Sequence, residues 1–158
     1  MITLSEIEKV QSKWAESIVL IGSLKSDKKA CEKATDEMLQ ELYAFQEGEV
    51  LFKPTRVSQK QFRLDLDAAK SYFIGGNSKH QEDKGFALHP WNFVSFENAA
   101  VILKENHATA MGNYFFTDPK GKQVKVEYSF GYIKDSNGGL KINLHHSSFP
   151  YNDDEHFD

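Results

Sequence analysis

The stretch Leu140-Lys-Ile-Asn-Leu-His-His-Ser-Ser-Phe-Pro-Tyr151 predicts the last strand of a sheet and the polar end of a pocket. Side chains on a regular strand alternate between its two faces. This alternation gives one predicted inner set: Leu140, Ile142, Leu144, His146 and Ser148. The face is apolar until its last two positions, which suits a pocket that needs hydrogen-bonding groups. Pro150 ends the strand because it has no N–H to donate.

The composition predicts one well-packed soluble domain. The chain has 158 residues, of which 40% are apolar and 13% aromatic, enough for a single core with a lined cavity. A net charge of -4 argues against nucleic-acid binding, because phosphate backbones are bound by clustered cations. Cys31 is the only cysteine, so an internal disulfide is impossible and a cytoplasmic location is expected. No apolar run is long enough to span a membrane, and the first residues do not resemble a signal peptide.

Helices are predicted for the first part of the chain. Thr3 or Ser5 can cap a helix that runs to about Gly22, with apolar residues on one face. Ser26 or Asp27 can cap a second helix that buries a stripe from Cys31 to Leu42. The region that follows is less regular. It contains a short strand at 50–55 with a possible partner at 61–64, and a short helix that Asp65 or Asp67 caps and Gly75-Gly76 ends.

The remaining chain predicts strands separated by turns. One strand or two are expected from 86 to about 101, interrupted near Pro90 and turned at Glu97-Asn98. Strands at 108–117 and 124–133 follow, the second with clean alternation of apolar and polar residues. The result is an α+β fold in which N-terminal helices pack on the concave face of a cone-shaped, curved, mostly antiparallel sheet. We expect a single domain over 1–158, made of a helical part at 1–46, a sheet part at 50–151 and a loose acidic tail at 152–158.

The histidine pair offers proton-transfer chemistry more readily than a metal site. His145 and His146 point to opposite faces of a regular strand, and position 144, where a second ligand on the His146 face would lie, is Leu. Zinc needs three or four converging ligands, and the other histidines show no ligand spacing. The pair His146 and Ser148 could transfer a proton and orient a water. The alternative is a histidine that is hydrogen-bonded for structural reasons.

Several motifs in the chain resemble the iota-class carbonic anhydrases over about residues 30 to 151. In order these are Val-Leu-Phe-Lys-Pro-Thr55, Ala-Ala-Lys-Ser-Tyr72-Phe, Ala-Met-Gly-Asn-Tyr-Phe-Phe116, Val-Glu-Tyr128-Ser-Phe-Gly-Tyr and His-His-Ser-Ser-Phe-Pro150. The closing His-His-Ser-Ser-x-Pro is the most specific of them. The resemblance implies a cystatin-like, nuclear-transport-factor-2-like fold, shared with the association domain of calcium/calmodulin-dependent protein kinase II.

The resemblance also implies a reaction and a site. The reaction is reversible hydration of carbon dioxide to bicarbonate and a proton, with carbon dioxide, bicarbonate and water as ligands. The implied catalytic residues are Thr55, Tyr72 and a His and Ser of the last strand, for which strand alternation selects His146 and Ser148. His145, Ser147 and Tyr128 are expected behind the site or at an interface. His146, with a reference pKa of about 6.5, is the expected proton acceptor.

One departure from the family pattern points to its metal-free branch. Metal-dependent bacterial members carry a third histidine where this chain has Leu144. We therefore expect a site without metal or other cofactor, in a homodimer that pairs through the outer face of the sheet. Two alternatives remain from the same superfamily. One is a non-catalytic oligomerisation module that binds a small carboxylate, and the other is a small isomerase or dehydratase.

Overall fold

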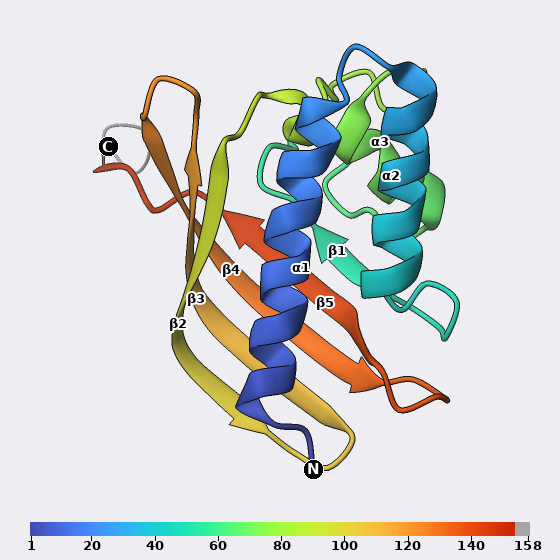
Figure 1. Ribbon diagram of the computed structural model, residues 1–158, viewed down its shortest axis with the longest axis vertical. Helices are drawn as coiled ribbons and strands as arrows, with labels where there is room; N and C mark the ends of the chain where they lie inside the picture. The colour runs from blue at the N-terminus through green and yellow to red at the C-terminus, as the bar shows by residue number, and fades with distance from the viewer. Residues whose placement is uncertain (154–158) are drawn as a thin grey trace.

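The computed structural model describes residues 1–153 and places three helices over one face of a five-stranded sheet (Figure 1). The helices are α1 (Leu4–Ser23), α2 (Lys28–Leu42) and α3 (Leu66–Ile74), and a 3₁₀ turn, η1, spans Phe86–Leu88. The strands are β1 (Leu51–Lys53), β2 (Phe93–Leu103), β3 (His107–Thr117), β4 (Gln123–Lys134) and β5 (Leu140–Ser148). They lie in the order β1-β5-β4-β3-β2, antiparallel except for the parallel pair β1 and β5. The predicted α+β fold is confirmed.

Local capping signals determine where the helices begin and end. Thr3 forms a capping box with Glu6, and the carboxylates of Asp27 and Asp65 each accept from the backbone N–H three residues on. Gly75 ends α3 with a φ of 67°, a conformation that residues other than glycine rarely adopt. None of the helices among the described residues is long and apolar enough to cross a membrane.

The core is an aromatic cluster centred on α1. The Trp14 ring contacts the rings of Phe73, Phe96, Tyr114, Phe116, Phe130 and His145. The predicted alternation of β4 is confirmed, because Val126, Tyr128, Phe130 and Tyr132 are all buried. Ring pairs of this kind contribute about 0.5–1.5 kcal/mol beyond their buried area, so the cluster fixes α1 firmly against the sheet.

Three local predictions need correction. The segment from residue 86 begins with the 3₁₀ turn η1, and the strand starts only at Phe93. The strand then continues through Glu97-Asn98 without a turn. A β-bulge between Asn98 and Ala100 shifts the register there. Residues 61–64 do not form a strand, although the Arg63 N–H donates to the Phe52 carbonyl at 2.7 Å. The tail predicted over 152–158 falls mainly on residues 154–158, which lie outside the described residues.

A second bulge, in β5, reverses the predicted orientation of the polar pair. Tyr132 pairs with Ile142 and Gly131 with Leu144, so Asn143 is an extra residue in β5. A Cβ added to Gly131 would lie 2.9 Å from both the Asn143 Oδ1 and the Leu144 Cβ, which explains the glycine opposite the bulge. After the bulge the side chains of β5 continue to alternate, but with the inner and outer faces interchanged.

The reversal affects the two histidines and the two serines. His145 and Ser147 are 2% and 1% exposed on the helix-covered face. His146 is exposed, and Ser148 lies on the outer face, where its hydroxyl donates to Glu127 at 3.4 Å. The prediction that His146 and Ser148 face the pocket is therefore wrong. It assumed a regular strand, and one extra residue interchanges the faces.

Candidate active site

The inward side chains of β5 end in a small cavity between the sheet and α3. Its volume is about 10 Å³, which is the space that one water molecule needs. Its walls are mainly aromatic and apolar: Trp14, Phe52, Pro54, Phe73 and Phe86. Its polar groups come from four separate segments: Thr55, Tyr72, Tyr114, His145 and Ser147. A few converging polar groups in an apolar pocket are typical of a site for a small ligand.

Thr55 reaches this cavity because Pro54 ends the short strand β1 beside β5. The parallel pairing sets Lys53 opposite His146, and the Lys53 ammonium donates to the Ser147 carbonyl at 2.9 Å. The chain leaves the sheet at Pro54, which has no N–H for the ladder. The Thr55 Oγ1 then lies 2.6 Å from the Ser147 Oγ. The two hydroxyls form the polar floor of the cavity.

A chain of hydrogen bonds runs from α1 through the imidazole to these hydroxyls. The Trp14 Nε1–H donates to the Tyr43 Oη at 3.0 Å, and the Tyr43 Oη lies 2.8 Å from the His145 Nδ1. On the other side of the ring, the His145 Nε2 lies 3.0 Å from the Tyr114 Oη. The Tyr114 Oη lies 2.6 Å from the Ser147 Oγ, which completes the path to Thr55.

The first members of this chain fix the tautomer of His145. The Tyr43 oxygen accepts from Trp14, so its own hydrogen is free to donate to the His145 Nδ1. A neutral imidazole that accepts at Nδ1 carries its hydrogen on Nε2 and donates it to Tyr114. Tyr114 in turn donates to Ser147. Only the Ser147 and Thr55 pair can exchange which oxygen donates, and this pair faces the cavity.

Burial keeps the titratable side chains of this hydrogen-bonded path neutral. Burial, and to a smaller extent the neighbouring His146, lower the pKa of His145 to about 3. The imidazole is held between the rings of Phe52 and Phe130, with centroids 4.7 and 4.1 Å away, which excludes water from both faces. Burial also raises the pKa of Tyr43 and Tyr114 well above their ordinary values, so both phenols remain donors.

Tyr72 provides a second fixed donor from α3. Its Oη accepts the backbone N–H of Arg56 at 3.2 Å, a bond that does not use its own hydrogen. Burial raises the pKa of this phenol, so it stays protonated. A buried ion pair holds the loops around it: Arg63 donates to both oxygens of Asp83 at 2.7 Å, and Ser71 of α3 adds a third hydrogen bond at 2.5 Å. The loop that carries Thr55 is thereby fixed relative to α3.

Comparison with known proteins identifies the family of this chain. A sequence profile described as metal-independent carbonic anhydrase matches residues 5–149. The chain belongs to this family. It is 42% identical over 153 residues to the metal-independent carbonic anhydrase of a Nostoc species, covering 95% of this chain and 75% of the relative. The recognition of a carbonic anhydrase from the sequence is confirmed.

Solved structures agree with this assignment. The crystal structure of a cyanobacterial iota-carbonic anhydrase in complex with bicarbonate matches with a TM-score of 0.92 and 39% identity, covering 96% of this chain and 94% of that one. A putative calcium/calmodulin-dependent protein kinase II association domain from Xanthomonas campestris matches with a TM-score of 0.54 and 24% identity, covering 92% and 86%. The second likeness concerns the fold alone.

The cavity contains some of the predicted site residues and not others. Thr55 and Tyr72 line it, as do His145 and Ser147, which were expected behind the site. Tyr128 does not: its hydroxyl donates to Asn98 at 2.6 Å, in a separate polar cluster. Within residues 1–153, no three His, Cys, Asp or Glu side chains form a group that could hold a metal ion.

Sequence reasoning missed Tyr43, Trp14 and Tyr114 as members of the site. Tyr114 had a signal, because it lies in one of the motifs that carry the family resemblance and on the buried face of β3. Tyr43 had none. It follows the last residue of α2 and reaches His145 only because its backbone bridges to Ile142 of β5.

Proposed function

We propose that this chain catalyses the reversible hydration of carbon dioxide to bicarbonate and a proton in the cavity between Thr55, Tyr72, Tyr114, Ser147 and His145. One observation carries the proposal: a buried imidazole and three hydroxyls form one hydrogen-bonded chain that ends in a small, aromatic-walled cavity. The similar cyanobacterial protein was crystallised with bicarbonate, the product of this reaction.

The two kinds of wall suit the two substrates. Carbon dioxide is apolar and is expected to lie against the rings of Phe52, Phe73 and Phe86. The attacking water is held by the hydroxyls of Thr55 and Ser147, with its lone pair directed at the carbon. This placement makes the reaction intramolecular in effect, which lowers the entropic part of the barrier.

Fixed donors stabilise the charge that develops during attack. As the water oxygen bonds to carbon, negative charge grows on the carbon dioxide oxygens. Tyr72 donates to one of them. Its oxygen accepts the Arg56 N–H, and this bond leaves its own hydrogen available for the substrate. His145 acts at one remove: its Nε2–H keeps the Tyr114 hydroxyl donating toward Ser147.

The proton balance requires no charged base. The attacking water passes a proton to the hydroxyl pair of Thr55 and Ser147, while a hydrogen of that pair passes to the oxygen of the former carbon dioxide. The hydroxyls end as they began, and the product is carbonic acid. Carbonic acid then releases its proton to water and leaves as bicarbonate. The 2.6 Å separation of the two oxygens suits such an exchange.

The experiment is an assay of carbon dioxide hydration and of oxygen-isotope exchange between bicarbonate and water, on protein dialysed against a strong chelator. We expect turnover to survive chelation and to fall about a hundredfold in Thr55→Val, which removes one hydroxyl at nearly constant volume. Thr109→Val, on β3 outside the cavity lining, is the matched control. Loss of wild-type turnover on chelation, or an active Thr55→Val, would refute the proposal.

We also infer a cytoplasmic homodimer. The buried, unpaired thiol of Cys31 is compatible with a reducing compartment. Large apolar side chains remain exposed on strands β2 and β3, with Phe93, Ile102 and Met111 between 58% and 60% exposed. Exposed apolar residues on neighbouring strands are what a subunit interface would cover. Light scattering of wild type and of Met111→Lys tests this inference, since the charge would dissociate a dimer formed there.

A further inference from the structure

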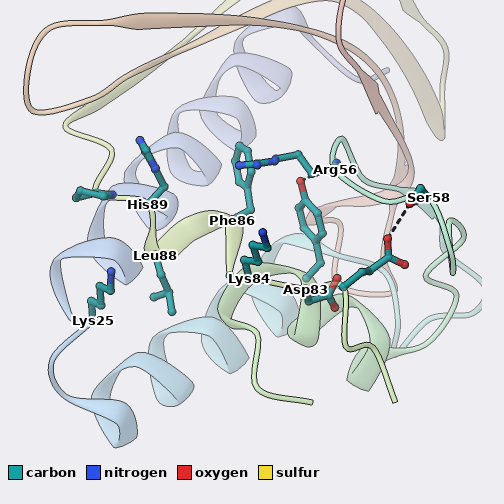
Figure 2. Close-up of a pocket in the computed structure, with 12 residues that line it drawn as sticks. Lys25, Arg56, Ser58, Asp83, Lys84, Phe86, Leu88 and His89 are labelled. Carbon is teal, nitrogen blue, oxygen red and sulfur yellow. Dashed lines mark hydrogen bonds between the residues drawn. The ribbon is translucent and has the colours of Figure 1, made fainter. Parts of the chain in front are cut away.

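A second, larger pocket, which Figure 2 shows, has two lining residues in common with the reaction cavity. Its volume is about 490 Å³. The rings of Tyr72 and Phe86 line both spaces, and they stack with centroids 5.6 Å apart and planes at 16°. Figure 2 shows the side chain of Arg56 extending over the pocket on the side of Phe86. The pocket therefore lies immediately outside the cavity, with only a pair of rings between them.

Three cations from separate segments line this outer pocket. They are Lys25 after α1, Arg56 after β1 and Lys84 before η1, all exposed. None of them forms an ion pair with any residue in the part of the chain that the structure describes. Unpaired cations from three separate segments around one concavity are a feature of anion-binding sites.

The acidic residues of the same pocket already bind other groups of the protein. Asp83 is neutralised by Arg63, with two contacts at 2.7 Å. Glu82 accepts backbone N–H groups from Ser58, Gln59 and Lys60 at 2.8–3.2 Å. Both carboxylates thus face donors of their own. The pocket is positive in a chain whose formal net charge is -4, so its charge is a local feature.

We infer that this outer pocket is an anion antechamber that binds bicarbonate at a second position, outside the reaction cavity. The inference rests on the proposed function for the identity of the anion. In dehydration the antechamber raises the local concentration of bicarbonate beside the rings of Tyr72 and Phe86. In hydration it receives the anion after the product has ionised. Arg56 contributes to both spaces. Its backbone N–H donates to the Tyr72 Oη, and its side chain lines the outer pocket.

The test must measure anion affinity rather than the preferred direction. The equilibrium constant of the reaction fixes the ratio of kcat/KM in the two directions, so no variant can favour one of them. Electrostatic capture is instead recognised by its sensitivity to salt, because screening over about 10 Å at 0.1 M ionic strength weakens it. Nitrate, a planar oxyanion that cannot react, serves as the second probe.

The experiment compares two triple variants with the same change in charge. The first triple variant removes the three positive charges of the antechamber: Lys25→Gln, Arg56→Gln and Lys84→Gln. The control triple removes three exposed lysines that do not line it: Lys9→Gln, Lys104→Gln and Lys120→Gln. We expect the first triple to raise the KM for bicarbonate and the Kd for nitrate about tenfold at low ionic strength, and to abolish most of the salt dependence. The control triple should stay within about twofold of wild type.

The outcomes separate this inference from the proposed function. Nitrate binding measured by calorimetry needs no turnover, so it tests the antechamber even if the protein failed to hydrate carbon dioxide. Equal nitrate affinity and salt dependence in the two triples would overturn the inference. The single variant Arg56→Lys keeps the charge, so it should retain wild-type salt dependence. If its salt dependence instead fell to that of the glutamine triple, positive charge would not be what captures the anion, and the inference would fail.

Discussion

The two faces of β5 carry the same residue types in opposite environments. On the inner face, His145 and Ser147 are buried and belong to one hydrogen-bonded chain. On the outer face, His146 is exposed and Ser148 donates to Glu127 at 3.4 Å. An imidazole and a hydroxyl therefore do not make a site by themselves. Burial, ring packing and fixed donors distinguish the inner pair, and each of these can be tested against the outer pair.

The largest expected difference is in turnover. Ser147→Ala removes the hydroxyl that links Tyr114 to Thr55, so the chain of donors is broken beside the substrate. Losing one such donor costs about a hundredfold in rate. Ser148→Ala makes the same chemical change on the outer face and should leave the hydration rate within about twofold of wild type. Stopped-flow hydration assays on both variants measure this difference. Equal losses of rate would contradict the assignment of the site to the inner face of β5.

The pH dependence of stability should separate the two histidines next. In the folded protein the pKa of His145 is about 3, against a reference value of about 6.5 in the unfolded chain. Between these values the unfolded state binds one more proton, so the free energy of unfolding falls as the pH drops below about 6.5. From pH 7 to pH 5 the loss amounts to about 2 kcal/mol.

Urea titrations at pH 7 and pH 5 measure this loss. His146→Gln should show the same drop as wild type, because its side chain is exposed. His145→Gln should show a smaller drop, whatever its absolute stability. A drop that persists unchanged in His145→Gln would mean that other groups cause it.

Much of this fold follows from local signals, and the error in the site came from one residue. Thr3, Asp27 and Asp65 cap their helices through contacts three residues away, which a sequence displays directly. The bulge at Asn143 depends on Gly131 in the neighbouring strand, and no local pattern in β5 reveals it. The chemistry was predictable because His and Ser each occur twice in succession. The choice between the copies was not, since it depends on pairing across strands.

The fixed tautomer gives a smaller effect that sharpens the comparison. Tyr43→Phe removes the donor to the His145 Nδ1, so the imidazole can carry its hydrogen on either nitrogen. We expect kcat/KM for hydration to fall about tenfold, because part of the population no longer donates to Tyr114. Nitrogen NMR of labelled histidine should show a single Nε2–H tautomer in wild type and a mixture in the variant. A pure Nε2–H form in Tyr43→Phe would show that Tyr43 does not set it.

The smallest expected effect is the most discriminating. With His145 neutral down to a pKa of about 3 and the site phenols raised by burial, no group of the cavity changes charge between pH 6 and pH 9. The hydration kcat/KM should therefore be constant within about twofold over this range. If a solvated imidazole accepted the proton, the rate would fall towards tenfold per pH unit below the reference histidine pKa of about 6.5. A flat profile assigns proton transfer to the inner hydroxyls, whereas a sloping profile that His146→Gln abolishes would return it to the outer face.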